Sequence, residues 1–153
     1  METLKIFFRL FVLKACPGDL EPSYGLLGIL VFLNFLLELV GLKVFWLMLL
    51  TVLVWKLFFI FFLLKFNKLD TRFIQTGTAL WGMFFIFSVI KFACFHLPFS
   101  MPILNIILTA MALWQLVVTS FILQRALSTH IGWAILATIG FFLSSGLVML
   151  LFL

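Results

Sequence analysis

Long apolar runs separated by short polar breaks make up the hydropathy pattern of this chain of 153 residues. Within a run almost every side chain is apolar, without the alternation of polar and apolar residues that indicates a β-barrel. A bilayer core of about 30 Å is crossed by about 20 residues of α-helix. The pattern therefore predicts an all-α, polytopic transmembrane helical bundle in one domain.

The polar breaks divide the bundle into about five spans. Pro98 and Pro102 interrupt any helix that would join the third span to the fourth. Residues 65–80, KFNKLDTRFIQTGTAL, are the main polar interruption, and Asp70 or Thr71 is expected to cap the helix that follows. The spans are expected over residues 24–42, 44–64, 73–96, 103–123 and 131–153.

The composition supports a membrane protein and argues against a water-soluble domain or a nucleic-acid-binding protein. Hydrophobic residues make up 66% of the chain and charged residues 10%, and the mean hydropathy is +1.36, so a water-soluble domain could not cover its own surface with polar groups. The lipid bilayer is the first expected partner. The net charge of +5 does not indicate nucleic-acid binding, because the basic residues lie beside the spans and form no single patch.

The basic residues predict the orientation of the chain. Lys65, Lys68 and Arg72 stand together in one short loop, which the positive-inside rule assigns to the cytoplasm. The N-terminus is then cytoplasmic and the C-terminus lies on the far side. Seven basic residues share the cytoplasmic side, against Lys43 and Lys91 on the far side: Lys5, Arg9, Lys14, Lys65, Lys68, Arg72 and Arg125.

Residues 1–16 are expected to form a cytoplasmic, amphipathic helix that lies in the membrane interface. Glu2, Lys5 and Arg9 fall on one face of such a helix, with apolar side chains over most of the remainder. Arg9 and Lys14 interrupt the apolar stretch, which argues against a cleaved signal peptide. Pro17 would end the helix before the first span.

A few polar side chains lie within the predicted spans, where each is costly and needs a partner or a purpose. Asn34 and Glu38 share one face of the first span, Lys56 lies in the second and Lys91 near the far end of the third. A Glu38–Lys91 pair is the first contact to expect. The simplest interpretation is a structural ion pair and a snorkelling lysine, and the alternative is an ion- or proton-handling site.

Polar stripes also run along the third and fourth spans. Gln75 and Thr78 lie on one side of the third span, and Asn105, Thr109 and Gln115 on roughly one side of the fourth. Small and polar residues hold transmembrane helices together through close approach and hydrogen bonds. Helix packing is therefore the main interpretation, and a polar cavity between these two spans is the alternative.

No pattern in the chain indicates catalysis. The sequence has no metalloprotease HExxH, nucleophile elbow, glycine-rich phosphate loop or paired carboxylates on one helix. Cys16 and Cys94 are expected at opposite membrane faces, which excludes a disulfide between them and suits no metal site. We therefore expect a non-enzymatic protein without a cofactor or a metal.

The segment RFIQTGTAL at 72–80, with Trp114 in the fourth span and RALSTHIGWAIL at 125–136, resembles bacterial members of the Yip-domain family. The resemblance covers residues 65–153, and Phe73, Gln75 and Thr76 carry its most specific part. It implies a five-span bundle that organises membrane partners without catalysis. The long soluble N-terminal region of eukaryotic members is missing here, which favours a bacterial inner-membrane protein over Rab-type partner binding.

Two functions remain as hypotheses. The first is an accessory, scaffold or assembly subunit that packs against other membrane-protein subunits or against copies of itself. The phenylalanine-rich stretch LFFIFFLL at 57–64 would supply an apolar contact face. The second is a small transporter or ion pathway that uses Glu38, Lys56 and Lys91.

Overall fold

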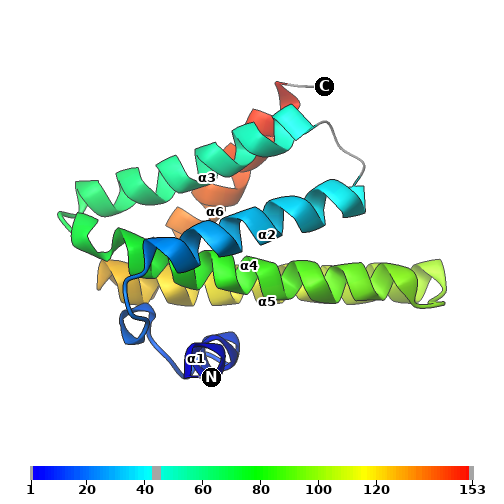
Figure 1. Ribbon diagram of the computed structural model, residues 1–153, viewed down its shortest axis with the longest axis horizontal. Coiled ribbons are helices and arrows are strands. Elements are labelled where there is room, and N and C mark those ends of the chain that lie inside the picture. The colour runs from blue at the N-terminus through cyan, green and yellow to red at the C-terminus, as the bar shows by residue number, and fades with distance from the viewer. Residues whose placement is uncertain (1, 43–45, 152–153) are drawn as a thin grey trace.

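The structure, a computed structural model, describes residues 2–42 and 46–151 of the chain. Within these ranges all regular structure is helical, which confirms the predicted all-α bundle. The order along the chain (Figure 1) is α1 (Glu2–Phe11), η1 (Pro17–Asp19), α2 (Tyr24–Leu42), α3 (Trp46–Phe66), η2 (Asp70–Arg72), α4 (Phe73–His96), α5 (Met101–Leu127) and α6 (Ile131–Leu150).

Four of the described helices are long and apolar enough to cross a membrane: α3, α4 together with η2, α5 and α6. They contain 20 to 27 residues, and about 20 helical residues are needed to cross the hydrocarbon core. The described apolar part of α2, Tyr24–Val40, is shorter, so the fifth span stays a prediction. Three expectations concern residues that the structure does not describe. They are the start of the second span at 44, the position of Lys43 on the far side, and the end of the fifth span at 152–153.

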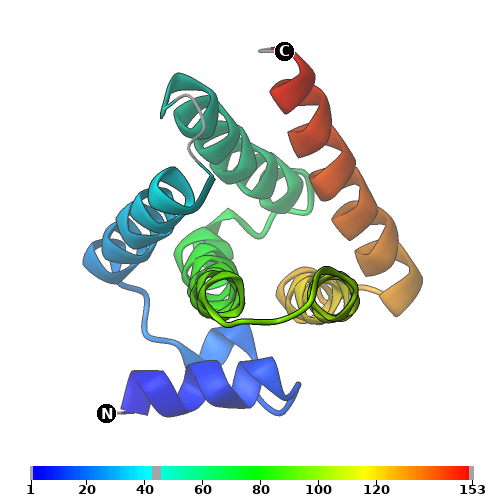
Figure 2. The same ribbon diagram turned by 90° about the vertical axis from the view of Figure 1, so that its right-hand side faces the viewer.

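Helix α4 lies at the centre of the bundle. It packs against α1, η1, α2, α3 and α5, while α6 completes the bundle by packing on α3 and α5 (Figure 2). Every residue from Thr76 to Phe84 on α4 is buried, so this half of the helix has no face turned to lipid. A central helix that is buried all round needs no polar side, which explains the nearly uniform apolar sequence.

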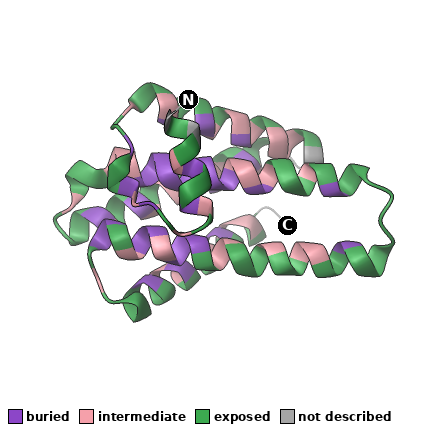
Figure 3. Ribbon diagram, turned by 90° about the horizontal axis from the view of Figure 1, so that it is seen from below, coloured by how far each residue is buried: buried purple, intermediate pink, exposed green. Residues whose placement is uncertain are grey.

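Burial is uneven along the length of the bundle. Figure 3 shows that buried residues gather in one half, whereas α4 and α5 are mostly exposed or partly buried where they approach their mutual turn. Leu97 to Ser100 form that turn, and Pro102 is accommodated in the first turn of α5, where its missing N–H is not needed. The two ends of the bundle are therefore built differently.

Helix α1 crosses α4 and α5 instead of running beside them (Figure 2). The ring of Phe7 occupies the space that Gly82, near the middle of α4, leaves open by lacking a side chain. Phe11 adds contacts to Phe87 and Trp114, with ring centroids 5.5 and 6.3 Å apart.

The N-terminal segment does form a helix, with Lys5 and Arg9 exposed, but the helix ends at Phe11 and not at Pro17 as expected, because Leu13 has the left-handed φ of 60°. Its apolar side, however, contacts other helices of the protein instead of being left for lipid. An interfacial position relative to the membrane stays a prediction.

The connector between α3 and α4 is held by Arg72 instead of by a capping side chain. The expected cap from Asp70 or Thr71 is wrong, because Arg72 occupies the N-cap position of α4 and the structure shows no side-chain cap hydrogen bond there. The Arg72 guanidinium instead donates from Nη1 to the Ala126 carbonyl and to Ser128 Oγ, each at 3.2 Å. This links the α3–α4 connector to the end of α5.

Candidate functional site

Three ionisable side chains from three helices meet at the more open end of the bundle. Glu38 comes from α2, Lys56 from α3 and Lys91 from α4. They line two adjoining cavities of about 290 and about 280 Å³, and Glu38, Ser88 and Lys91 are common to both. The structure thus brings together the three charges that the sequence singled out within its predicted spans.

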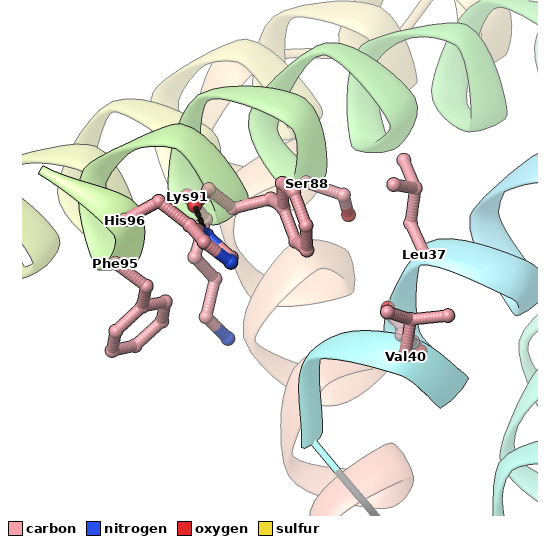
Figure 4. Close-up of a pocket in the computed structure, with 8 residues that line it drawn as sticks. Leu37, Val40, Ser88, Lys91, Phe95 and His96 are labelled. Carbon is pink, nitrogen blue, oxygen red and sulfur yellow. Dashed lines mark hydrogen bonds between the residues drawn. The ribbon is translucent and has the colours of Figure 1, made fainter.

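The outer cavity lies between α2 and the last turns of α4. Figure 4 shows Leu37 and Val40 on α2 across an open space from Lys91 and Phe95 on α4. One part of its wall is polar and the other apolar. Its lining consists of Leu37, Glu38, Val40, Ser88, Lys91, Phe92, Phe95 and His96.

His96 stands at the end of α4 beside the outer cavity. Its Nδ1 lies 2.8 Å from the Phe92 carbonyl oxygen, and because a carbonyl only accepts, Nδ1 must donate this bond. The ring also contacts the Phe92 ring, with centroids 4.2 Å apart. These contacts hold the imidazole against its own helix and leave Nε2 for a further partner.

The inner cavity continues from the outer one toward the middle of the bundle. It reaches Lys56 on α3 and Gln115 on α5, among apolar side chains that include Phe84, Phe87 and Met111. The Lys56 Nζ lies 5.5 Å from the centroid of the Phe84 ring and 6.0 Å from that of Trp81. An ammonium at these distances is attracted by the negative faces of the rings.

The three charges do not neutralise one another by direct contact. Among the described residues, no carboxylate oxygen lies within 4.0 Å of the Lys56 or Lys91 nitrogen, so the expected Glu38–Lys91 ion pair is wrong as a contact. Glu38 and Lys91 do act on Lys56 electrostatically across the cavity. The physical reason is the open space between α2 and α4, which keeps the side chains apart.

Asn34, one turn before Glu38, takes a structural part. Its Nδ2 donates to the carbonyls of Leu30 and Trp81, each at 2.9 Å, and the second bond joins α2 to α4. The side chain is buried and does not line either cavity. Asn34 Oδ1 and Trp81 Nε1 are buried without a protein partner.

The polar stripes of α4 and α5 make different contacts. Gln75 Nε2 donates to the Leu20 carbonyl at 2.9 Å and so fastens η1 to α4, while Thr78 is buried with an unpaired hydroxyl. Thr109 Oγ1 donates to the Asn105 carbonyl on its own helix, and both residues are exposed. No described helix of this chain covers Asn105 and Thr109, so their packing role stays a prediction, whereas Gln115 of the same stripe reaches a cavity.

Sequence reasoning missed two groups of polar residues. Ser88 lies in an apolar stretch, and its only signal is the spacing of three residues to Lys91, which places both on one face of α4. Ser120 donates to Thr138 Oγ1 at 3.0 Å and joins α5 to α6. Isolated serines and threonines are too common in such helices to mark a site by themselves.

The predicted cytoplasmic loop lies at the end of the bundle away from the cavities (Figure 1). Lys65, Lys68 and Arg72 are exposed there, and the Lys65 Nζ lies 5.7 Å from the centroid of the Phe61 ring. Cys16 and Cys94 are both free thiols. In the described part of the chain no three ligand-type side chains gather where a metal ion could bind.

Comparison with protein-family models, with curated proteins and with solved structures finds no match to this chain. The resemblance to the Yip-domain family therefore stays a prediction. What the structure does establish is an all-helical protein with four helices able to cross a membrane and a charged cavity at one end.

Proposed function

We propose that this protein is a membrane-embedded binding site or pathway for a small charged solute. The observation that carries the proposal is the meeting of Glu38, Lys56 and Lys91 at two adjoining cavities without direct pairing. A lysine at the centre of a transmembrane helix costs about 2.5–3.5 kcal/mol, so unpaired charges at this depth favour a functional role. The proposal assigns no catalytic step to the site.

The proposed topology has five spans, α2 to α6, with the N-terminus in the cytoplasm of a bacterial cell. The charged connector with Lys65, Lys68 and Arg72 then lies on the cytoplasmic side, in agreement with the positive-inside rule. The α4–α5 turn and the outer cavity beside His96 would face the other side of the membrane. A solute would enter there and reach Lys56 through the inner cavity.

Cysteine accessibility tests the pathway without knowledge of the solute. In a background with Cys16→Ala and Cys94→Ala, the variants Ser88→Cys and Gln115→Cys should react with a membrane-impermeant thiosulfonate added from one side only. Val54→Cys on α3 is the matched control, because Val54 is exposed on the outside of the bundle and lines neither cavity. Failure of both cavity positions to react from either side would contradict an aqueous pathway.

Flux measurements test whether the solute crosses the membrane. Proteoliposomes are challenged with a panel of small anions, small cations and protons, and the current is recorded on a supported membrane. Glu38→Gln and Lys91→Met should each reduce a signal that the unmodified protein gives. An unchanged signal in both variants would exclude a role of the cavity in that flux.

A second candidate function is that of an accessory or assembly subunit. It is favoured by an aromatic row on α3, in which the half-buried Trp55 and the exposed Phe58, Phe62 and Phe66 follow one another with ring centroids 6.0, 5.9 and 4.4 Å apart. Such a row offers a rigid apolar surface to another membrane protein or to a second copy of the chain. The proposal predicts a stable complex in mild detergent, and a protein that stays monomeric after cross-linking in cells would contradict it.

A further inference from the structure

The lining of the two cavities carries an excess of positive charge. Lys56 and Lys91 contribute two positive charges and Glu38 one negative charge, with the His96 ring beside the outer opening. A bound group with a single negative charge would balance this set. In the proposed membrane position the charges lie in a region of low dielectric constant, where such a balance is worth more than in water.

The outer cavity also has an apolar wall. Its α2 side carries Leu37 and Val40, and its α4 side carries Phe92 and Phe95. Val40 and Phe95 are 66% and 51% exposed, so the apolar wall continues onto the outer surface of the bundle (Figure 4). In a membrane this surface faces lipid, and an alkyl chain can lie along it without entering water.

From this arrangement we infer that the ligand is a single-chain amphiphile with a monoanionic head, a carboxylate or a phosphate diester. The inference rests on the proposed function and names the ligand class of the same site. The head group lies between Lys91 and Lys56 with Ser88 as a further donor, and the alkyl chain leaves between α2 and α4 along Val40 and Phe95. A cavity near 300 Å³ lies at the lower end of the volumes that small-molecule sites have.

Glu38 has a selecting role in this arrangement. Its carboxylate acts on Lys56 across the cavity and removes one unit of the positive charge. A dianion would leave one negative charge uncompensated beside Glu38, and a cation would meet net repulsion from the two lysines. The apolar wall in turn discriminates against anions without a tail, which gain nothing from Phe92 and Phe95.

Photo-cross-linking in phosphatidylcholine nanodiscs tests the inference. The probe is a twelve-carbon alkyl carboxylate that carries a diazirine, and labelled peptides are located by mass spectrometry. We expect label within 37–40 and 88–96, competed by dodecanoate and by dodecyl methyl phosphate but not by acetate, inorganic phosphate or dodecylamine. The first two competitors share the anionic head and tail, and the others lack the tail or carry the opposite charge.

Charge variants assign the label to the site. Lys91→Met and Lys56→Met should each reduce competed labelling by about tenfold or more, because each removes a charged partner of the head group. Lys65→Met is the matched control, since Lys65 is exposed at the other end of α3, and labelling should stay unchanged. Where a methionine variant fails to give a single size-exclusion peak, Lys91→Gln replaces it.

Three outcomes overturn the inference. They are equal competition by acetate or inorganic phosphate, equal competition by dodecylamine, and undiminished labelling in both lysine variants. If Ser88→Cys and Gln115→Cys react with the thiosulfonate while labelling is not competed, the ligand class is wrong and the pathway stands. If neither cysteine reacts, the proposed pathway itself fails.

Discussion

The two halves of α4 are packed differently. From Thr76 to Phe84 every residue is buried, and Gly77 and Gly82 admit neighbouring side chains close to the backbone. Between Ser88 and His96 the side chain of Cys94 is buried, while Lys91 and its neighbours border open cavities. One helix thus provides a packed scaffold at one end and a charged site at the other.

The difference shows how close packing and open, charged cavities are separated along a single apolar helix. A packed region loses stability when a side chain is enlarged, because protein interiors have few voids. A region with unpaired charges gains stability when a charge is removed, because no direct ion pair offsets the cost of its burial. Substitutions in the two halves should therefore change stability with opposite sign.

The largest effect is expected at Gly82 in the packed half. Gly82→Leu should lower the free energy of unfolding by about 3 kcal/mol, because the new side chain needs the space that the Phe7 ring occupies. Denaturation in detergent, followed by tryptophan fluorescence, measures the change. Gly146→Ala is the control and should stay within about 0.5 kcal/mol, since its added methyl group would meet open space.

A double substitution tests whether Phe7 is the cause. Gly82→Ala should destabilise the protein alone, and in a Phe7→Ala background the same change should cost much less. Additive effects would show that the clash lies elsewhere and that α1 does not dock on α4 in this way.

The opposite sign is expected at Lys56. Lys56→Met keeps the length and apolar character of the side chain and removes a charge that has no direct ion-pair partner. The free energy of unfolding should therefore rise by about 2 kcal/mol. The same variant should lose solute-dependent signal in proteoliposomes. Lys65→Met should change neither, and a destabilised Lys56→Met protein would contradict the description of an uncompensated site.

A smaller loss is expected at Asn34, which borders the packed half. Asn34→Ala removes the hydrogen bonds to the Leu30 and Trp81 carbonyls and should cost about 1–2 kcal/mol. Asn105→Ala, at an exposed position, is the matched control and should be neutral. Equal effects of the two variants would contradict a stabilising role of Asn34 in the α2–α4 contact.

The smallest effect is expected at the α3–α6 contact. Trp55 Nε1 donates to Ser144 Oγ at 3.0 Å, and Trp55→Phe should cost about 0.6 kcal/mol, the mean value for such bonds in membranes. Ser144→Ala should give a similar loss, and the double variant should lose little more than either single one. Independent, additive losses would contradict the bond.

The sequence anticipated the elements better than their contacts. Helices α2 and α4 occupy the ranges in which the first and third spans were expected, and α5 starts two residues before the expected 103 because Pro102 fits its first turn. Glu38, Lys56 and Lys91 could be singled out because charges are rare in apolar runs. Ser88 could not be singled out in this way. The exposure of Asn105 and Thr109 could not be predicted either, because a polar stripe on one helix does not indicate which neighbouring helix, if any, covers it.

The sequence by itself determined that the chain forms long apolar helices in a fixed order. The reason is local, because a chain in hydrocarbon must satisfy its backbone hydrogen bonds within each segment, and every long apolar run then becomes a helix. The tertiary structure decided which half of α4 is packed and which is open. Nearly uniform helices carry no polar side to mark a buried face, so the contact of Phe7 with Gly82 and the meeting of three charges at one cavity arise from packing alone.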